Sequence, residues 1–436
     1  MTVPYSNLEV AVPYDVPDHF YASSTEPPKV QTPQRSNTRK TWLIIVAVVV
    51  LVGALAGGLA GGLLSRNRSG ASNTDDATAS TPTNATTSSS TGPLALSQLA
   101  SLNWTDSSQI LRRAVFYQHD NALFLSQYHQ SNDSWTAFNI SDVFERESIS
   151  INAKQGTPLA TAATSIDDIN AGLTDFTATL FYLDTDNYIQ ELVCTDEDLI
   201  SSWSLGDLQN HKIIAAENSN LAALAYFCPN DGQDYLCNNQ FTILYQAVDQ
   251  SIMFVGATGW EPSKMASGWP GGGVAMYPFA SDDGTNLTDV SEIRFYYQTN
   301  TIIELSIQNY LGRYTAPGES NPILSNQEVR NDLVPKIVAS PRNYHSEAII
   351  MSMDGAGNIT GTYYSPNTWN HDNKIRFQNQ DGATTVGYLS VDLTSIAMDH
   401  NGTFYGISAN GSAIMAYSWS AESIFGFVWK ESITVS

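Results

Sequence analysis

Cysteine and basic side chains are scarce in this chain of 436 residues. Three cysteines are too few to staple a small scaffold with disulfide bonds. Lys and Arg number 20 against 43 Asp and Glu, so the formal net charge at pH 7 is −23. Because a field of that sign repels phosphates, the composition excludes a role in binding nucleic acids.

Catalytic signatures are also missing from the sequence. No cluster of His, Cys, Asp and Glu has the spacing of metal ligands. No local motif combines Ser, His and Asp in the way that a nucleophilic hydrolase requires. The sequence therefore predicts no metal, no cofactor and no enzymatic activity.

One long apolar run contains no charged residue and extends over 23 residues, 42–64. As a helix it would cross a hydrocarbon core of about 30 Å. It begins too far from Met1 for a typical signal peptide, and Arg66 follows it where a cleavage site would be needed. We predict a disordered cytoplasmic tail over residues 1–40 and a transmembrane helix over residues 41–64.

Three glycines inside this run, Gly53, Gly57 and Gly61, recur every four residues. Glycines at that spacing share one face of a helix and allow a second helix to approach closely. One interpretation is a homodimer formed through this face. The other is that glycine is simply frequent in membrane helices.

The charges and glycosylation signals that flank the run indicate its orientation. Four basic residues precede it closely and two follow it, a bias that places the N-terminus in the cytoplasm. All Asn-X-Ser/Thr acceptors lie after the run; Asn67 is close to the expected bilayer, and the predicted glycosylation sites are Asn84, Asn103, Asn132, Asn139, Asn286, Asn358, Asn401 and Asn410. The C-terminal part is therefore expected outside the cell or in the lumen of the secretory pathway.

The segment that follows, residues 65–94, is rich in Ser and Thr, which make up 13 of the 24 residues from Ser69 to Gly92. Such a composition cannot bury enough apolar surface to order itself. We predict an O-glycosylated stalk that holds the next domain away from the membrane.

Residues 95–436 read as short β-strands separated by polar turns, and they contain an internal repeat. Its first signature is a small residue beside aliphatic residues, with alanines at Ala100, Ala160, Ala222, Ala275, Ala339 and Ala397. Six similar units, each long enough for four strands, predict a six-bladed β-propeller. The small residue fits the innermost strand, where the blades crowd around the axis.

A second signature is a strand followed by a polar turn and another strand, as at Ala114–Gln118, Ala178–Tyr182 and Ile293–Gln298. At these motifs residues 95–436 resemble the fungal fucose-specific lectin family. The resemblance implies pockets between neighbouring blades, each with an Arg on one strand, a Glu on the next and an aromatic side chain. It implies carbohydrate, specifically fucose-type glycans, as the partner of this protein.

Both charged groups of the family pattern are present in one unit, where Arg294 precedes Glu304. The second unit has Glu191 with Thr179 at the Arg place, and the first has Ala114 and Ser126 at the two places. The resemblance thus predicts Arg294, Glu304 and Glu191 as carbohydrate-binding residues, in pockets that are mostly degenerate. Their stacking partner is expected among Tyr310, Tyr314 and Trp369.

Alternatives remain open for several of these interpretations. Arg294 and Glu304 can instead form a solvent-facing ion pair of little energetic value, and the whole propeller can be a protein-interaction or structural module that binds no sugar.

Sialidases share the six-bladed fold, but their turn motif is not matched at residues 352–360. Cys228 and Cys237 flank a polar loop that a disulfide could close, which leaves Cys194 as a small core residue. The alternative is three buried thiols.

Overall fold

The computed structural model describes part of the chain, namely residues 94, 96–164, 176–225, 241–257, 259–279, 292–299, 301–308, 314–315, 335–342, 346–365, 368–370, 375–387 and 393–435. All of them belong to one compact unit, which runs from Ala85 to Ser436. Among these residues no helix is long and apolar enough to cross a membrane. Outside the described residues lie the predicted tail, the predicted span, residues 65–93 of the stalk, Cys228, Cys237, Asn84 and Asn286.

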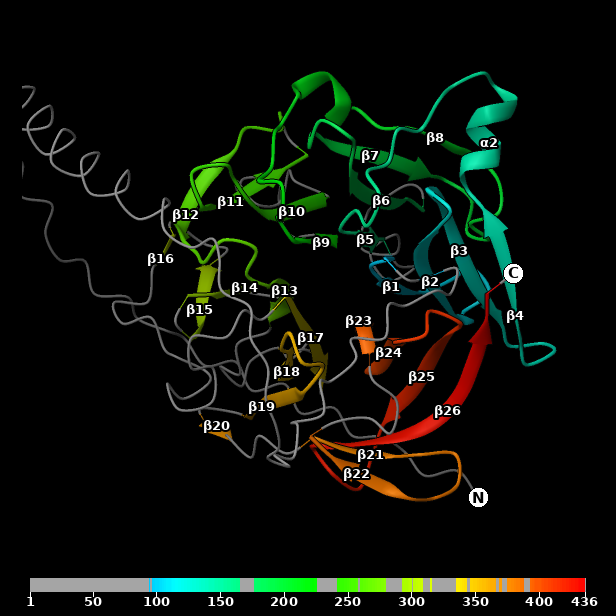
Figure 1. Cartoon of the computed structure of the whole chain (residues 1–436), viewed down its shortest axis with the longest axis vertical. Helices are drawn as coiled ribbons and strands as arrows, with labels where there is room; N and C mark the ends of the chain where they lie inside the picture. The colour runs from blue at the N-terminus through cyan, green and yellow to red at the C-terminus, as the bar shows by residue number, and fades with distance from the viewer. Residues whose placement is uncertain are drawn as a thin grey trace, which may run out of the picture. The chain divides into compact units, whose positions relative to one another are not determined.

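The described residues form six β-sheets that surround a common centre (Figure 1). We call the sheets blades and number them in chain order. Blade 1 consists of β1 (Ala100–Thr105), β2 (Leu111–His119), β3 (Ala122–His129) and β4 (Ser134–Asn139), blade 2 of β5 (Ala160–Ala163), β6 (Ala178–Leu183), β7 (Ile189–Cys194) and β8 (Trp203–Leu205), and blade 3 of β9 (Leu221–Ala225), β10 (Phe241–Gln246), β11 (Ser251–Gly256) and β12 (Ser263–Ser267).

The second half of the domain repeats this plan. Blade 4 consists of β13 (Val274–Phe279), β14 (Glu292–Gln298), β15 (Ile302–Gln308) and β16 (Tyr314–Thr315), blade 5 of β17 (Lys336–Arg342), β18 (Glu347–Met353), β19 (Ile359–Ser365) and β20 (Thr368–Asn370), and blade 6 of β23 (Leu393–Met398), β24 (Thr403–Ser408), β25 (Ala413–Trp419) and β26 (Gly426–Thr434). Helical structure in the described residues is limited to α2 (Ser141–Arg146) and the 3₁₀ turn η1 (Leu208–His211). The expected all-β propeller is therefore confirmed.

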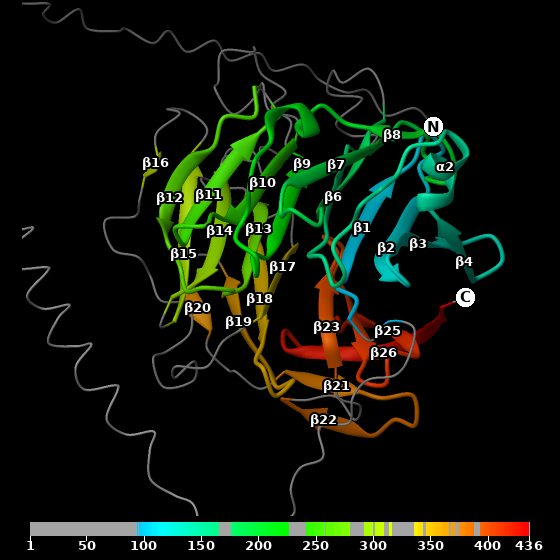
Figure 2. The same ribbon diagram turned by 45° about the horizontal axis from the view of Figure 1, so that its top comes forward.

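Blade 6 is larger than the others because a hairpin extends its outer edge. The hairpin strands are β21 (Arg376–Gln378) and β22 (Thr384–Val386), and β21 pairs with β26 in parallel orientation. In Figure 2 this hairpin lies beyond β26, away from the other blades. Phe377 of β21 is fully buried against Phe404, Tyr417 and Phe427, which anchors the hairpin to the blade.

The middle strands of the blades are covered on both faces. Every residue of β6, β10 and β24 is buried. One face of each strand packs on the preceding blade and the other face on the following blade, so the sequence shows continuous apolar runs in place of strict alternation.

The small residue of the repeat lies on the innermost strand and faces the next blade. Ala100 packs with residues of blade 2, and Ala275 packs with residues of blade 5. In blade 5 this position is occupied by Val338, whereas Ala339 faces back toward blade 4. The prediction that Ala339 is the small residue of this repeat was therefore wrong by one residue.

Crowding near the axis is close between blades 4 and 5. A Cβ atom on Gly273 would lie 2.7 Å from the backbone nitrogen of Ile337. Only glycine permits that approach, because no other residue lacks a Cβ atom.

Blade 1 and blade 6 contact each other and close the ring. Tyr117 and Val115 of blade 1 belong to one buried cluster with Tyr405 and Ile407 of blade 6. The amide of Leu99 also donates a hydrogen bond of 3.0 Å to Ser395 Oγ, although 296 positions separate these residues in the sequence.

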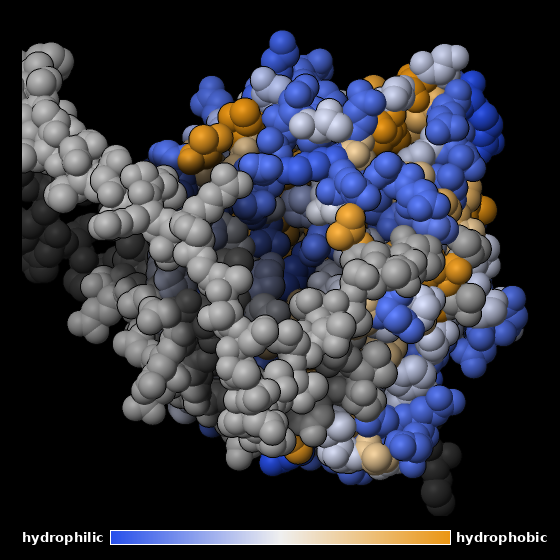
Figure 3. Space-filling model, viewed as in Figure 1, coloured by the Kyte–Doolittle hydropathy of each residue, from blue (hydrophilic) through white to orange (hydrophobic). Residues whose placement is uncertain are grey.

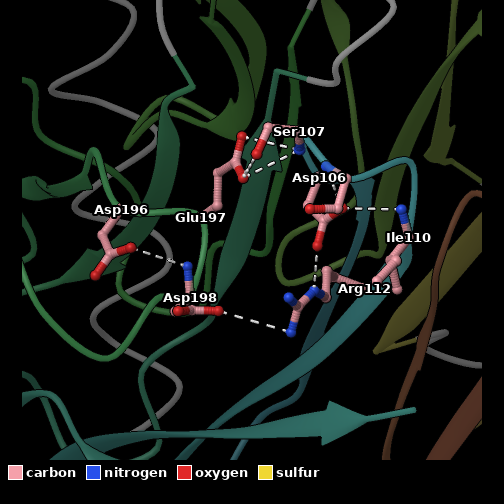
Figure 4. A network of polar contacts seen from close by, with 8 residues as sticks. Asp106, Ser107, Ile110, Arg112, Asp196, Glu197 and Asp198 are labelled. Carbon is pink, nitrogen blue, oxygen red and sulfur yellow. Dashed lines mark hydrogen bonds and ion pairs between the residues drawn. The ribbon is translucent and has the colours of Figure 1, made fainter. Parts of the chain in front are cut away.

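Blades 1 and 2 are joined near their outer loops by a polar network (Figure 4). Asp106 accepts hydrogen bonds from the amides of Ser108 and Ile110 at 2.9 and 2.8 Å and from Arg112 Nε at 2.7 Å. The guanidinium of Arg112 then approaches Asp198 of blade 2 at 3.6 Å. Asp106 is almost fully buried, so these bonds satisfy a carboxylate that burial would otherwise destabilise.

Candidate functional site

Arg294 and Glu304 lie together at the interface between blades 4 and 5. Glu304 of β15 pairs with Tyr296 of β14, and Arg294 is two residues before Tyr296, so all three side chains lie on one face of the sheet. Arg294 Nη1 is 3.7 Å from Glu304 Oε2, and the two side chains are 10% and 13% exposed. The pair is therefore buried between blades, unlike the solvent-facing ion pair of the alternative interpretation.

Aromatic rings cover the Arg294 guanidinium. Its Cζ atom is 3.3 Å from the ring centroid of Phe279 in the same blade and 4.4 Å from that of Tyr364 in blade 5. Both distances are within the range of a cation–π interaction. The ring of Trp369 packs edge-on against Tyr364 and Tyr296, with centroid distances of 5.0 and 6.4 Å.

Of the three aromatic residues expected at this site, the structure places Trp369 there. Tyr310 lies outside the described residues, and for Tyr314 only the backbone is described. Sequence reasoning missed Phe279 and Tyr364. Both could have been suggested by alternation along their strands, but only if the facing blade were already known.

Two tyrosine hydroxyls extend the polar part of the site. Tyr296 donates a hydrogen bond of 2.7 Å to Glu304 Oε2, and its ring stacks on Tyr277 with an interplanar angle of 5°. Burial raises the pKa of both tyrosines well above the usual value, and the Glu304 carboxylate raises it further. For Arg294 burial acts to lower the pKa, but Tyr277, Tyr296 and Glu304 outweigh it and the pKa is raised. The guanidinium therefore remains a charged donor at every physiological pH.

Glu191 is at the corresponding place in blade 2, because it pairs with Phe181 as Glu304 pairs with Tyr296. Its Oε2 atom accepts a hydrogen bond of 3.2 Å from the amide of Leu208. A Cβ atom on Gly206 would collide with the same carboxylate, so the chain passes directly over it. Glu191 thus lies apart from the Arg294–Glu304 pair, at the interface of blades 2 and 3.

The first blade has neither charged group. Phe116 pairs with Leu125, and this pair corresponds to Tyr296 and Glu304 in blade 4. Leu125, and not Ser126, therefore occupies the Glu place. Ser126 faces the opposite interface, where its hydroxyl is 3.4 Å from that of Tyr117.

Two arginines that the sequence pattern did not single out as site residues also contact aromatic rings between blades. Arg113 is one residue before the expected Arg place, so it faces blade 6, and its Cζ atom is 4.0 Å from the ring centroid of Tyr128. Arg342 at the end of β17 has its Cζ atom 4.9 Å from the ring centroid of Trp419 in blade 6. Neither arginine fits the family pattern. The sequence signal that could have indicated them is the presence of an arginine beside a strand rich in aromatic residues.

The remaining predicted residues differ in accessibility. Cys194 is a free, fully buried cysteine, as predicted, and burial raises the pKa of its thiol to about 12. Among the described glycosylation acceptors, Asn103 and Asn139 are partly buried, and the exposed ones are Asn132, Asn358, Asn401 and Asn410. Within the described residues no group of three or more His, Cys, Asp or Glu could hold a metal ion.

Comparison with known proteins identifies the fold. No protein-family model matches the chain, and no curated protein matches it. Among solved structures it is similar to the lectin of Aleuria aurantia, described as a six-bladed β-propeller with a novel fucose recognition mode, at 18% identity and a TM-score of 0.52. That match covers 78% of this chain and 96% of the lectin.

Two further structures are similar to a comparable degree. AofleA from Arthrobotrys oligospora is 16% identical with a TM-score of 0.52, and the match covers 79% of this chain and 89% of AofleA. The SapL1 lectin, solved with α-methyl fucoside, is 16% identical with a TM-score of 0.51, over 78% of this chain and 96% of SapL1. The solved structures to which the chain is similar thus include fungal fucose-specific lectins, as the sequence motifs suggested.

The position of Glu191 generates a pH-dependent prediction. Burial raises the pKa of this carboxyl group, although hydrogen bonds from the backbone of Leu208 and Asp207 partly oppose the shift. Glu191 therefore keeps its proton to a higher pH in the folded state than in the unfolded state. As a result, the contribution of Glu191 to the free energy of unfolding of the wild type falls as the pH rises from about 4.5 through the raised pKa. In the Glu191→Gln variant this loss is absent.

Denaturant unfolding of both proteins between pH 4 and pH 7 measures the effect. We expect the difference in free energy of unfolding, variant minus wild type, to increase with pH. A difference that stays constant or decreases would contradict the burial of an ionisable Glu191.

Proposed function

We propose that this protein is a membrane-anchored lectin-like propeller that binds fucose-type glycans weakly, through the site between blades 4 and 5. The supporting observation is the combination of Arg294, Glu304 and Trp369 at one interface between blades. The other described blades lack this combination, so most pockets of the ring are degenerate. The alternative is that the propeller is a protein-interaction or structural module that binds no sugar.

The chemistry of the site suits a sugar. A guanidinium offers a rigid fork of donors to ring and hydroxyl oxygens, and a carboxylate accepts hydroxyl protons. An aromatic face covers the apolar C–H face of the sugar. Binding of this kind needs no nucleophile and no metal, and one such site binds weakly unless several copies act together.

The alternative function is favoured by the covering of Arg294. Phe279 and Tyr364 occupy positions over its guanidinium, at 3.3 and 4.4 Å from their ring centroids. An arginine held in this way can join two blades without binding a sugar. The two functions differ in whether glycan affinity depends on the charged pair.

Conservative variants of the full-length protein separate the two functions. Arg294→Lys keeps the charge but loses the donor fork, and Glu304→Gln keeps the shape but loses the negative charge. We expect each to weaken binding of α-methyl fucoside by about tenfold, the effect of one charge-assisted hydrogen bond. Titration calorimetry or a glycan array measures this, with thermal unfolding as a check that the fold is retained.

The matched control is Arg113→Lys, which changes a buried, aromatic-stacked arginine at another interface. We expect this variant to bind the fucoside as the wild type does. Unchanged affinity in both site variants would reject the assigned residues. Absence of binding to every glycan would leave the interaction module as the function.

For location, we propose a single membrane span over residues 42–64 with the tail of residues 1–40 in the cytoplasm. The propeller would then lie outside the cell or in the secretory lumen, held by the stalk and joined to a second copy through the face of Gly53, Gly57 and Gly61. The support is the uncharged run and the one-sided distribution of glycosylation acceptors.

Enzymatic removal of N-glycans tests this topology. Asn132, Asn358, Asn401 and Asn410 are exposed acceptors, so they should carry glycans if the propeller lies outside the cytoplasm. We expect treatment of the native protein to increase its electrophoretic mobility, and Gln substitution at these four residues to reduce that change. Identical mobility before and after treatment would argue against the outward placement.

A further inference from the structure

One position of the repeat carries a charge at the centre of the propeller. The residue just before the aliphatic residue of each innermost strand lies at the same end of the central channel. These residues are Gln98, Pro158, Asn220, Gly273, Lys336 and Ser395. Five are neutral, and Lys336 is the cation.

Lys336 is buried without a partner among the residues that the structure describes. The residue is 6% exposed, and its Nζ atom makes no hydrogen bond to any described residue. An ammonium group removed from water without a counter-charge destabilises a folded protein. Burial lowers the pKa of Lys336 to about 8, so the ammonium group is still largely protonated at neutral pH.

Lys336 is one of the residues that line a cavity at the axis. This axial cavity has a volume of about 410 Å³, within the range of small-molecule sites. Its lining includes the polar residues Gln98, Asn220 and Thr394 as well as Lys154. Figure 3 shows a hollow near the middle of the molecule, with hydrophilic residues along one side of it.

The other charged groups around this cavity do not neutralise Lys336. Lys154 is a second cation, and its Nζ atom already donates to Asn187 Oδ1 and to the carbonyl oxygen of Glu217, both at 2.8 Å. The Glu217 side chain is exposed at the rim, and His400 lines the channel beyond. Among the described lining residues, none supplies Lys336 with a carboxylate partner.

We propose that the axial cavity binds a small oxyanion, a carboxylate or a phosphate or sulfate group, with Lys336 as its counter-charge. The anion would provide the acceptor that the buried ammonium lacks. Asn220, Gln98 and Thr394 would offer neutral hydrogen-bonding groups for the rest of the ligand. The site is at the axis, so it is separate from the interfaces between blades and independent of the proposed glycan binding.

Thermal unfolding of the full-length protein with added anions tests this proposal. The probes are inorganic phosphate, sulfate and glucuronate, at concentrations up to about 10 mM. We expect the melting temperature to rise with anion concentration at about pH 6.5 and to respond much less at about pH 9.5, where Lys336 is neutral. A stronger response to glucuronate would indicate an acidic sugar or similar carboxylate, and a stronger response to the inorganic ions a phosphate or sulfate.

The Lys336→Met variant removes the charge and keeps the length of the side chain. Since it also removes an unpaired buried charge, it should melt at higher temperature than the wild type without anion, and its anion affinity should fall at least about tenfold. Lys264→Met is the matched control, because Lys264 is an exposed lysine on β12, and it should respond as the wild type does.

Three results would overturn the proposal. One is an equal anion response in wild type and Lys336→Met, and another is no response to any of the three anions. The third is a response of equal size at both pH values. Fucoside affinity measured on Lys336→Met should equal that of the wild type, so failure here is distinguishable from failure of the glycan site.

Discussion

Face-to-face packing of neighbouring sheets is the constraint on which the rest of this structure depends. Each middle strand is buried on both faces, so each side chain that points out of a blade meets the next blade. Near the axis the available space decreases, and at Gly273 even a Cβ atom is excluded. Burial of continuous apolar surface between sheets supplies the main stabilising free energy.

The same packing explains why charged groups between blades are informative. An ionised side chain placed there must be paired or it destabilises the fold. Glu191 is satisfied by the backbone of Leu208, and Arg294 by Glu304 and a shell of aromatic rings. Lys336 has no such partner among the described residues, which is why we assign it a ligand.

The architecture could be predicted from the sequence because the repeat recurs six times. Errors of one residue arose where the hairpin turns differ in length. Five residues separate Leu183 of blade 2 from its partner Ile189, whereas four separate the equivalent Gln118 of blade 1 from Leu123. Counting along the motif therefore put Ser126 at a place that belongs to Leu125, and each such shift turns a side chain to the other interface.

The two rings over Arg294 could not be predicted as its neighbours, because strand pairing and the packing of blades bring them there. Phe279 precedes Arg294 in the same blade, and Tyr364 belongs to blade 5, and no spacing rule connects them. The burial of Lys336 could not be predicted either, because it results from the closed ring of blades and not from the sequence of its own strand. The charged pair itself was predicted from the resemblance to the fucose-specific lectins, whose pattern has an Arg on one strand and a Glu on the next.

The central claim is that the first and last blades close the ring, and the Leu99 amide reports on it directly. Its hydrogen bond to Ser395 exists only when blade 1 packs on blade 6. Hydrogen exchange measured residue by residue should show Leu99 among the slowly exchanging amides, and Ser395→Ala should accelerate exchange there while strands β2 and β3 remain protected. Rapid exchange of Leu99 in the wild-type protein would contradict a closed propeller.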